Sequence, residues 1–395
     1  KNADFTKSNL GGSKLNSLNL EKAKLSEANL SDTHLVHANL KWADLTEAKL
    51  ASSNLQGVNL TSAVLKAADL SRANLSWASF VGANLVDANL SESKVDETDF
   101  TSANLSGSNL KGLDFQRGKL SKANLTETIL ELSNLSWANL SDATLIGANL
   151  RNVNLSSTAL EASNLSGSDL SNAKLTHADL SSSNLVGAKL NQADLSSAKL
   201  FGVSLETAQL NNVKLVHADL TGSSLLKAIL KESELTSVTL TDADLSDVII
   251  TNSNLTYSNL IRTKFNNATL HQSNLSWAKV TEADFSGANL KDSIIASSDL
   301  SSSNFQNANL EGVDLNSSKL VNAVLIEADL SNSVLAGANL SGSDLTSVNL
   351  SNANLTNTNL SNLNLRNTDL SNVIFSGTNL SGADLRGALV TNLND

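Results

Sequence analysis

The sequence predicts an all-β solenoid, a chain that coils repeatedly around one narrow hydrophobic core. Three observations predict this fold. Every residue whose number is a multiple of five, from Phe5 to Val390, is Leu, Phe, Val or Ile. The residue two positions earlier is usually small, as at Ala28 and Ser53, and charges just before the core position alternate in sign at every fourth pentad. A period of five fits neither a helix nor a flat strand, so we expect one corner per pentad.

Composition excludes several classes of site and partner. The chain has 395 residues, a formal net charge of -11 and no Cys, Met or Pro. Without Cys, disulfides and thiolate metal sites are excluded. The negative charge argues against direct binding to nucleic acid or to an anionic membrane surface. No apolar run approaches the roughly 18 residues of a membrane-spanning helix, so we expect no transmembrane segment.

The repeated unit reads A-(N/D)-L-(S/T)-x, as in ADLTE at 43–47. In this unit the sequence resembles the pentapeptide-repeat family over residues 3–393. The resemblance implies a right-handed quadrilateral parallel β-helix with four pentapeptides per 20-residue coil. For 1–395 we therefore expect a single continuous pentapeptide-repeat solenoid of about 19 to 20 coils, with no distinct capping domain. At about 4.8 Å per coil it would be roughly 94 Å long.

Charged residues test the 20-residue coil independently of the resemblance. Like charges that stack directly are destabilising and opposite charges favourable. Among residues immediately before a core position, a separation of 20 gives fifteen opposite-charge pairs and no like-charge pair. Separations of 15 and 25 both give like-charge pairs, for example Asp99 with Asp114 and Lys174 with Lys199. Only the 20-residue coil sorts the charges.

The same period predicts what lies inside the coil and at its corners. Phe265, Phe285 and Phe305 fall in one column, as do Phe80 and Phe100. We expect these rings to stack as core packing and not to hold a cofactor. Asn residues before the core position, such as Asn339, Asn349 and Asn359, are expected to satisfy turn backbone groups.

No pattern in the sequence predicts an enzyme, a cofactor or a metal site. His177 and His217 lie two coils apart, roughly 10 Å, which is too far to share a metal ion. His34 and His37 are close, but two ligands do not make a site. The repeat has no Gly-rich phosphate loop and no insertion loop, where catalytic residues usually lie. We therefore expect neither catalytic nor cofactor-binding residues.

One column departs from the monotony of the repeat. Seven of the ten Trp, Tyr and His residues leave the same remainder, 17, when their numbers are divided by 20. Each is the second residue after a core position and should point outward. Trp42, His34 and His271 lie elsewhere. Trp and Tyr are enriched at protein interfaces, so we predict an interaction stripe. This ring stripe consists of His37, Trp77, Trp137, His177, His217, Tyr257 and Trp277.

These features favour a structural or assembly protein, a rigid rod that self-associates end to end or side by side into a filament or surface layer, or that presents a binding face. The repeat runs from Ala3 to Leu393 without a capping helix, which predicts either a fragment or head-to-tail stacking. The partner of the stripe would be another rod, another protein or a glycan. The lack of Cys and Met and the Ser- and Asn-rich surface favour an extracellular or cell-surface location.

One alternative role is implied by the family resemblance, and another by the flat faces of a β-helix. Some members of the family resemble duplex DNA in size and charge and bind DNA gyrase, a topoisomerase, as mimics. Here the acidic residues alternate with Lys and the charge is much sparser than that of DNA, so we rank this role second. Ice binding would need a regular array of Thr, and the Thr residues are scattered.

Overall fold

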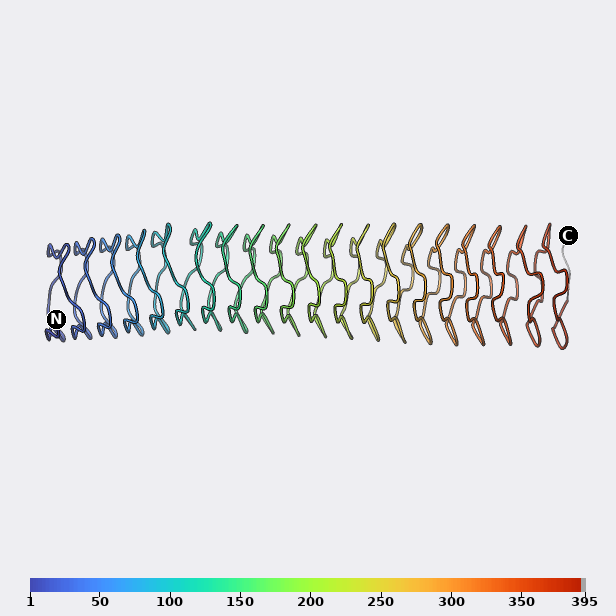
Figure 1. Cartoon of the computed structure of the whole chain (residues 1–395), viewed down its shortest axis with the longest axis horizontal. Coiled ribbons are helices and arrows are strands. Elements are labelled where there is room, and N and C mark those ends of the chain that lie inside the picture. Colours follow the sequence, from blue (N-terminus) through green and yellow to red (C-terminus); the bar gives the residue numbers. More distant parts are fainter. Residues whose placement is uncertain (392–395) are drawn as a thin grey trace. The chain divides into compact units, whose positions relative to one another are not determined.

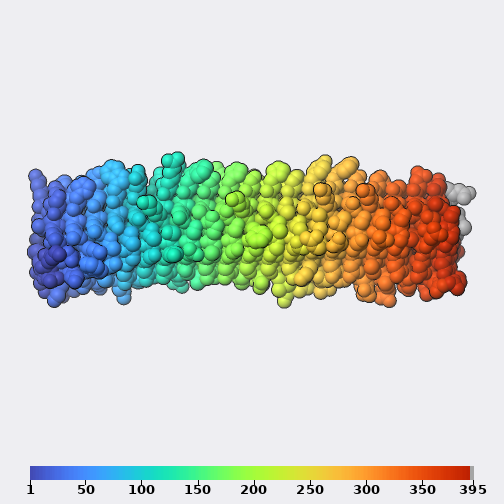
Figure 2. All heavy atoms as spheres, in the orientation of Figure 1, coloured from blue at the N-terminus to red at the C-terminus, as the bar shows by residue number. Residues whose placement is uncertain are grey.

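The computed structural model describes residues 1–391. It divides into two compact units, Lys1–Lys199 and Leu200–Asp395, which we call unit 1 and unit 2. In each unit, successive coils of the chain lie side by side (Figure 1). Their side chains form adjoining bands of colour on the face drawn in Figure 2. The prediction of one continuous domain over 1–395 stays a prediction.

Each pentad forms one corner of a coil. The carbonyl of a core residue accepts a hydrogen bond from the amide three residues later, as from Ala23 to Leu20 at 2.9 Å. Lys22, the second residue inside that turn, has φ +60°. A positive φ at this place is typical of a type II turn. The chain therefore changes direction once per pentad, as the five-residue period predicts.

The coils are joined by parallel bridges between residues 20 positions apart. Every bridge joins single residues just before a core position, for example Asp4 to Lys24 and Lys24 to Asp44, and no longer strand or helix occurs in 1–391. The amide of Leu25 donates to the carbonyl of Asp44 at 2.7 Å, and the amide of Lys24 donates to that of Ala3 at 2.9 Å. The predicted 20-residue coil is confirmed.

The core is a column of aliphatic and aromatic side chains inside each unit. Leu25 and Ala28, a core residue and a small residue of the repeat, are both fully buried. The predicted phenylalanine stacks are also confirmed. The ring centroids are 4.9 Å apart in the pair Phe80–Phe100, and 4.7 and 4.9 Å apart along Phe265, Phe285 and Phe305.

Asn side chains close the corners, as predicted. The amides of the residues two positions later donate to the side-chain oxygens of Asn339, Asn349 and Asn359 at 3.1, 3.1 and 3.2 Å. Some also form a ladder between coils. The Asn154 amide nitrogen donates to the side-chain oxygen of Asn134, one coil earlier, at 3.0 Å. One residue type thus stabilises both the turn and the stacking of coils.

The charge pairing between coils is only partly present as ion pairs. Lys199 lies 3.2 Å from Asp179 and Lys24 lies 3.6 Å from Asp4. Both lysine side chains are largely exposed, so each pair contributes little to stability. Their main effect is to keep like charges from stacking on one another.

The ladder is interrupted once in unit 1. Among residues 1–199, all of them described, every stacked pair of this kind is bridged except Lys94 and Asp114. The trace in Figure 1 opens at this point of the chain. Leu113, at a position usually held by Ala or Ser, and Phe115 both lie inside the coil there. We attribute the interruption to this extra inward volume, because overpacking forces the backbone apart.

Candidate functional site

The repeat holds every residue of the ring stripe in the same backbone conformation. Each is the second residue of a corner with positive φ, for example +60° at Trp77 and +62° at Trp137. The amide of Trp77 donates to the carbonyl of Asp96 at 2.8 Å, and that of Trp137 donates to Ser156 at 3.0 Å. The side chains therefore project outward from a backbone fixed by the coil beside it.

Unit 1 holds His37, Trp77, Trp137 and His177, and all four are exposed. The exposed fractions of Trp77 and Trp137 are 55% and 62%. Large aromatic surface left in water along one column is typical of a binding face. The structure thus places these predicted residues at the surface.

Trp137 and His177 line one shallow hollow of about 520 Å³. They lie two coils apart, and Ser157 occupies the same position in the coil between them. Because Ser157 is small, no large side chain fills the surface between the two rings. The arrangement can take a flat group between the rings, which is a binding geometry and not a catalytic one.

An ion pair lies at the edge of this hollow. Lys199 donates to Asp179 at 3.2 Å, and both residues line the hollow. Burial alone would raise the pKa of Asp179. The hydroxyl and amide of Ser181, which donate at 2.7 and 3.1 Å, and the charge of Lys199 outweigh that effect and lower its pKa. The carboxylate is therefore held ionised beside the stripe.

His37 lies differently from the tryptophans. Its imidazole leans over Gly57, at the same place in the next coil, where a Cβ atom would collide with the ring. Gly57 also has φ +63°, which favours glycine. The only signal of this contact in the sequence is that a Gly lies 20 residues after His37.

Unit 2 holds His217, Tyr257 and Trp277. Tyr257 and Trp277 are one coil apart, and their rings stack with centroids 6.5 Å apart and planes inclined by 14°. Both remain exposed, at 62% and 59%. These two stripe rings one coil apart are therefore in contact, while His217 makes no ring contact within 200–391.

Two of the three rings outside the stripe, Trp42 and His271, have local partners. The ammonium groups of Lys41 and Lys22 lie 4.1 and 5.3 Å from the ring centre of Trp42, a cation–π arrangement. His271 Nδ1 is 2.9 Å from the carbonyl oxygen of Lys291. These contacts separate Trp42 from the stripe tryptophans, for which none of the described residues supplies a cation.

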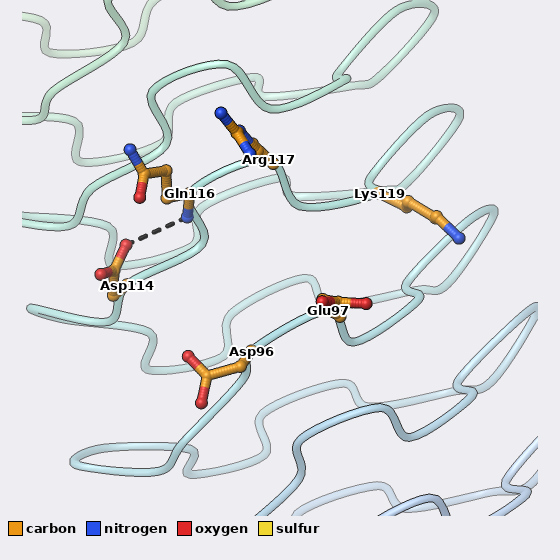
Figure 3. A pocket seen from close by; sticks show the side chains of 6 residues that line it. All are labelled: Asp96, Glu97, Asp114, Gln116, Arg117 and Lys119. Atoms are coloured by element: carbon orange, nitrogen blue, oxygen red, sulfur yellow. Dashed lines mark hydrogen bonds between the residues drawn. The ribbon is translucent and has the colours of Figure 1, made fainter.

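A second hollow, of about 410 Å³, lies at the interruption of the ladder. Figure 3 shows Asp96 and Glu97 on one coil and Gln116, Arg117 and Lys119 on the next, with Asp114 also at its wall. This site was not predicted from the sequence. Its signals were the Leu at position 113 and the charged pair Glu97 and Arg117 within the stripe's own column.

The described residues offer no site for a metal ion. No group of three or more His, Asp or Glu side chains within 1–391 has a suitable arrangement. The same range contains no helix with the length and hydropathy needed to cross a bilayer. What the geometry does provide is a set of outward rings in one column within each unit.

The repeat decides the family. The family described as pentapeptide repeats (8 copies) matches in overlapping segments from 1–41 to 349–387. The chain belongs to the pentapeptide-repeat family. Membership implies a right-handed quadrilateral β-helix, which agrees with four buried core residues in every 20-residue coil from 21–40 to 341–360.

Solved structures of other pentapeptide-repeat proteins are similar to parts of the chain. HetL, described as involved in heterocyst differentiation regulation in the cyanobacterium Nostoc sp. strain PCC 7120, is 30% identical, with 60% of this chain and 89% of HetL covered and a TM-score of 0.25. QnrB1, a plasmid-mediated fluoroquinolone resistance protein, is 23% identical over 53% of this chain and 89% of its own, with a TM-score of 0.28.

A pentapeptide-repeat protein of the Arabidopsis thaliana thylakoid lumen is 26% identical. The match covers 31% of this chain and 70% of that protein, with a TM-score of 0.17. No curated protein matches the sequence. The family assignment therefore rests on the repeat itself, and the function has to be argued from the surface.

Proposed function

We propose that this protein is a structural, non-catalytic rod that binds protein partners, further copies of itself included, through the ring stripe. The observation that carries the proposal is the file of exposed rings, four of them large aromatics with more than half of their surface in water. Such rings provide large contact area at low cost in side-chain entropy. Side-by-side packing along the stripe would assemble rods into a bundle or layer.

The rigidity of the backbone supports this role. Each stripe residue is held by a hydrogen bond to the neighbouring coil, as at His37, whose amide donates to Gln56 at 2.9 Å. A preformed face loses little freedom when it binds, so more of the contact energy appears as affinity. A solenoid also offers the same face at regular intervals, which suits partners with their own repeat.

Serine replacement of the stripe tryptophans tests the proposal. In the variant Trp77→Ser, Trp137→Ser and Trp277→Ser, we expect the far-ultraviolet circular dichroism to be unchanged, because all three side chains lie outside the core. Association measured by analytical ultracentrifugation should weaken by at least about tenfold, since interface tryptophans commonly carry much of the binding energy.

Trp42→Ser is the matched control. Trp42 has the same place in the pentad and is 47% exposed, but it lies in another column and its ring is in contact with the ammonium groups of two lysines. Its replacement should leave association unchanged. Equal association of the triple variant and the unmodified protein, or equal loss in the control, would contradict the proposal.

A supercoiling assay separates this proposal from the role of a DNA mimic. In unit 1, Asp4 and Asp179 both lie within 4 Å of a lysine ammonium, which interrupts the acidic surface. We therefore expect no inhibition of gyrase at sub-micromolar protein. Inhibition there would favour the DNA-mimic role over the assembly role.

A further inference from the structure

The column that carries the ring stripe in unit 1 reads nearly the same in both directions. Residues at equal distances before and after the interrupted ladder match each other. The first pair has opposite charges, and the following pairs are two Trp, two small residues, two His and two Ser. The pairs are Glu97 with Arg117, Trp77 with Trp137, Gly57 with Ser157, His37 with His177, and Ser17 with Ser197.

From this pattern we infer that unit 1 pairs side by side and antiparallel with unit 1 of a second copy, about a two-fold axis between Glu97 and Arg117. A two-fold interface brings one surface patch against itself in reverse order, which is what a palindromic column requires. The inference rests on the proposed function, because it gives the partner and the register of the same stripe.

The geometry of the column permits this pairing. All ten residues occupy the same corner position with positive φ, so they form a single file. Neighbours in the file are about one coil apart, roughly 4.8 Å. Trp77 and Trp137 are therefore equally far from the axis on opposite sides, and each faces the other ring in the second copy. The interruption itself lies on the axis, so it does not disturb this symmetry.

The charges select the register. A shift of one coil would move the axis onto Glu97 or onto Arg117 and would place that residue opposite its own copy. Like charges directly opposite one another are unfavourable. The palindromic register instead brings Glu97 of each copy against Arg117 of the other, two ion pairs in all. Within residues 1–391, neither side chain has an ion-pair partner within 4 Å, so both are available.

The neighbouring columns agree with this register. Asp99 and Lys119, two residues after the central pair, also have opposite charges, and so do Lys94 and Asp114, three residues before it. In the antiparallel arrangement each would face its opposite in the second copy. The backbones of Asp99 and Lys119 are bridged to each other within the coil stack, which fixes the positions of the two residues relative to one another.

The hollow at the axis provides room for the central pairs. It has a volume of about 410 Å³ and is lined by both Glu97 and Arg117. In Figure 3 the two lie on opposite sides of it. A long side chain of the second copy can therefore enter between the coils, where the Lys94–Asp114 bridge is missing. This gives the interruption a place at the centre of the interface.

Charge reversal in the full-length chain tests the inference. Glu97→Arg alone should weaken dimerisation by at least about tenfold, because both contacts between residues 97 and 117 then join two positive side chains. Arg117→Glu alone should weaken it equally, because both contacts then join two negative side chains. An equimolar mixture of the two variants should dimerise again, since one copy then carries Arg at positions 97 and 117 and the other carries Glu, so both contacts join opposite charges. Sedimentation velocity at low salt measures all three.

Glu92→Arg is the matched control, because Glu92 is an exposed glutamate in the same coil and the same corner position, on another column. It should leave dimerisation unchanged. Unchanged dimerisation of both single variants, a mixture that stays monomeric, or an unmodified chain without a dimer would each overturn the inference. If the tryptophan variant still weakens association in that case, the proposed function stands and only this register fails.

Discussion

Two regions of the molecule contain three core phenylalanines each, and they behave differently. In unit 2, Phe265, Phe285 and Phe305 recur once per coil and stack with planes inclined by 8° and 5°. In unit 1, Phe80 and Phe100 stack in the same way, but Phe115 follows Phe100 after three pentads instead of four. Its ring meets that of Phe100 edge-on, at 69° and 5.9 Å.

The backbone follows the rings. Beside the regular stack, Asp284 is bridged to both Lys264 and Asn304, and the amide of Phe285 donates to Asn304 at 2.7 Å. Beside Phe115, the Lys94–Asp114 bridge is absent although both residues are described. Large core side chains are tolerated where they recur every 20 residues, because each ring then stacks directly on the ring of the previous coil. A large side chain that does not recur at this interval is accommodated by a separation of the coils.

Removing the middle ring of the regular stack should have the largest effect. Phe285→Ala deletes two stacking contacts and leaves a cavity in a fully buried column. We expect a loss of about 3–5 kcal/mol in the free energy of unfolding, measured by chemical denaturation. Thr281→Ala, an exchange in the same coil outside the core, is the control. A loss below about 1 kcal/mol would show that the stack is not a principal source of stability.

Transferring the bulk of the irregular region should reproduce its defect. Ala283 lies two residues before Phe285, as Leu113 lies two residues before Phe115. Ala283→Leu should therefore overpack this coil, cost about 1–3 kcal/mol and open the local ladder. Ala283→Ser, the residue that the repeat often uses here, should be tolerated. An intact ladder in the Leu variant would contradict our explanation of the interruption.

Amide hydrogen exchange should distinguish the two regions in the unmodified protein. The amide of Phe285 donates across the coils, whereas within residues 1–391 that of Val95 has no backbone acceptor. We expect exchange at Val95 to be at least about tenfold faster, because protection follows local opening. The amide of Phe80, which in the same unit donates to the carbonyl of Asp99 in the next coil, should be as protected as that of Phe285. Equal rates at Val95 and Phe285 would mean that the coils stay closed in solution.

The smallest expected effect is on the loss of stability at acidic pH. Burial alone would raise the pKa of Asp284, but hydrogen bonds from Asn266, Ser286 and Asn304 lower it overall. A lowered folded-state pKa contributes stability above the unfolded value, about 3.9, and this contribution is lost as the pH falls through the folded value.

Asp284→Asn should therefore lower the melting temperature at pH 7, where this contribution is present, and flatten its fall below about pH 4. Asn retains an oxygen to accept the bond from the Ser286 amide, as Asn residues do at other corners. Melting curves over pH 2–7 of the variant and the unmodified chain measure the difference. An unchanged acid slope would show that this carboxylate does not couple protonation to folding.

Sequence alone determined most of the fold and part of the site. The register of the core, the 20-residue coil, the phenylalanine stacks and the ring pair Tyr257–Trp277 all follow from counting. The physical reason is that a solenoid without insertions converts distance along the chain directly into place in space. Positions one coil apart must lie side by side, so patterns of charge and size can be compared from residue numbers alone.

Tertiary structure decided what depends on the summed volume and reach of side chains. It showed that Leu113 and Phe115 accompany an open ladder, that His37 leans over Gly57, and that lysines occupy Trp42. It also showed the hollow between Glu97 and Arg117. Counting assigns each of these residues to a column, but whether two coils close or separate depends on how all their inward side chains pack at once.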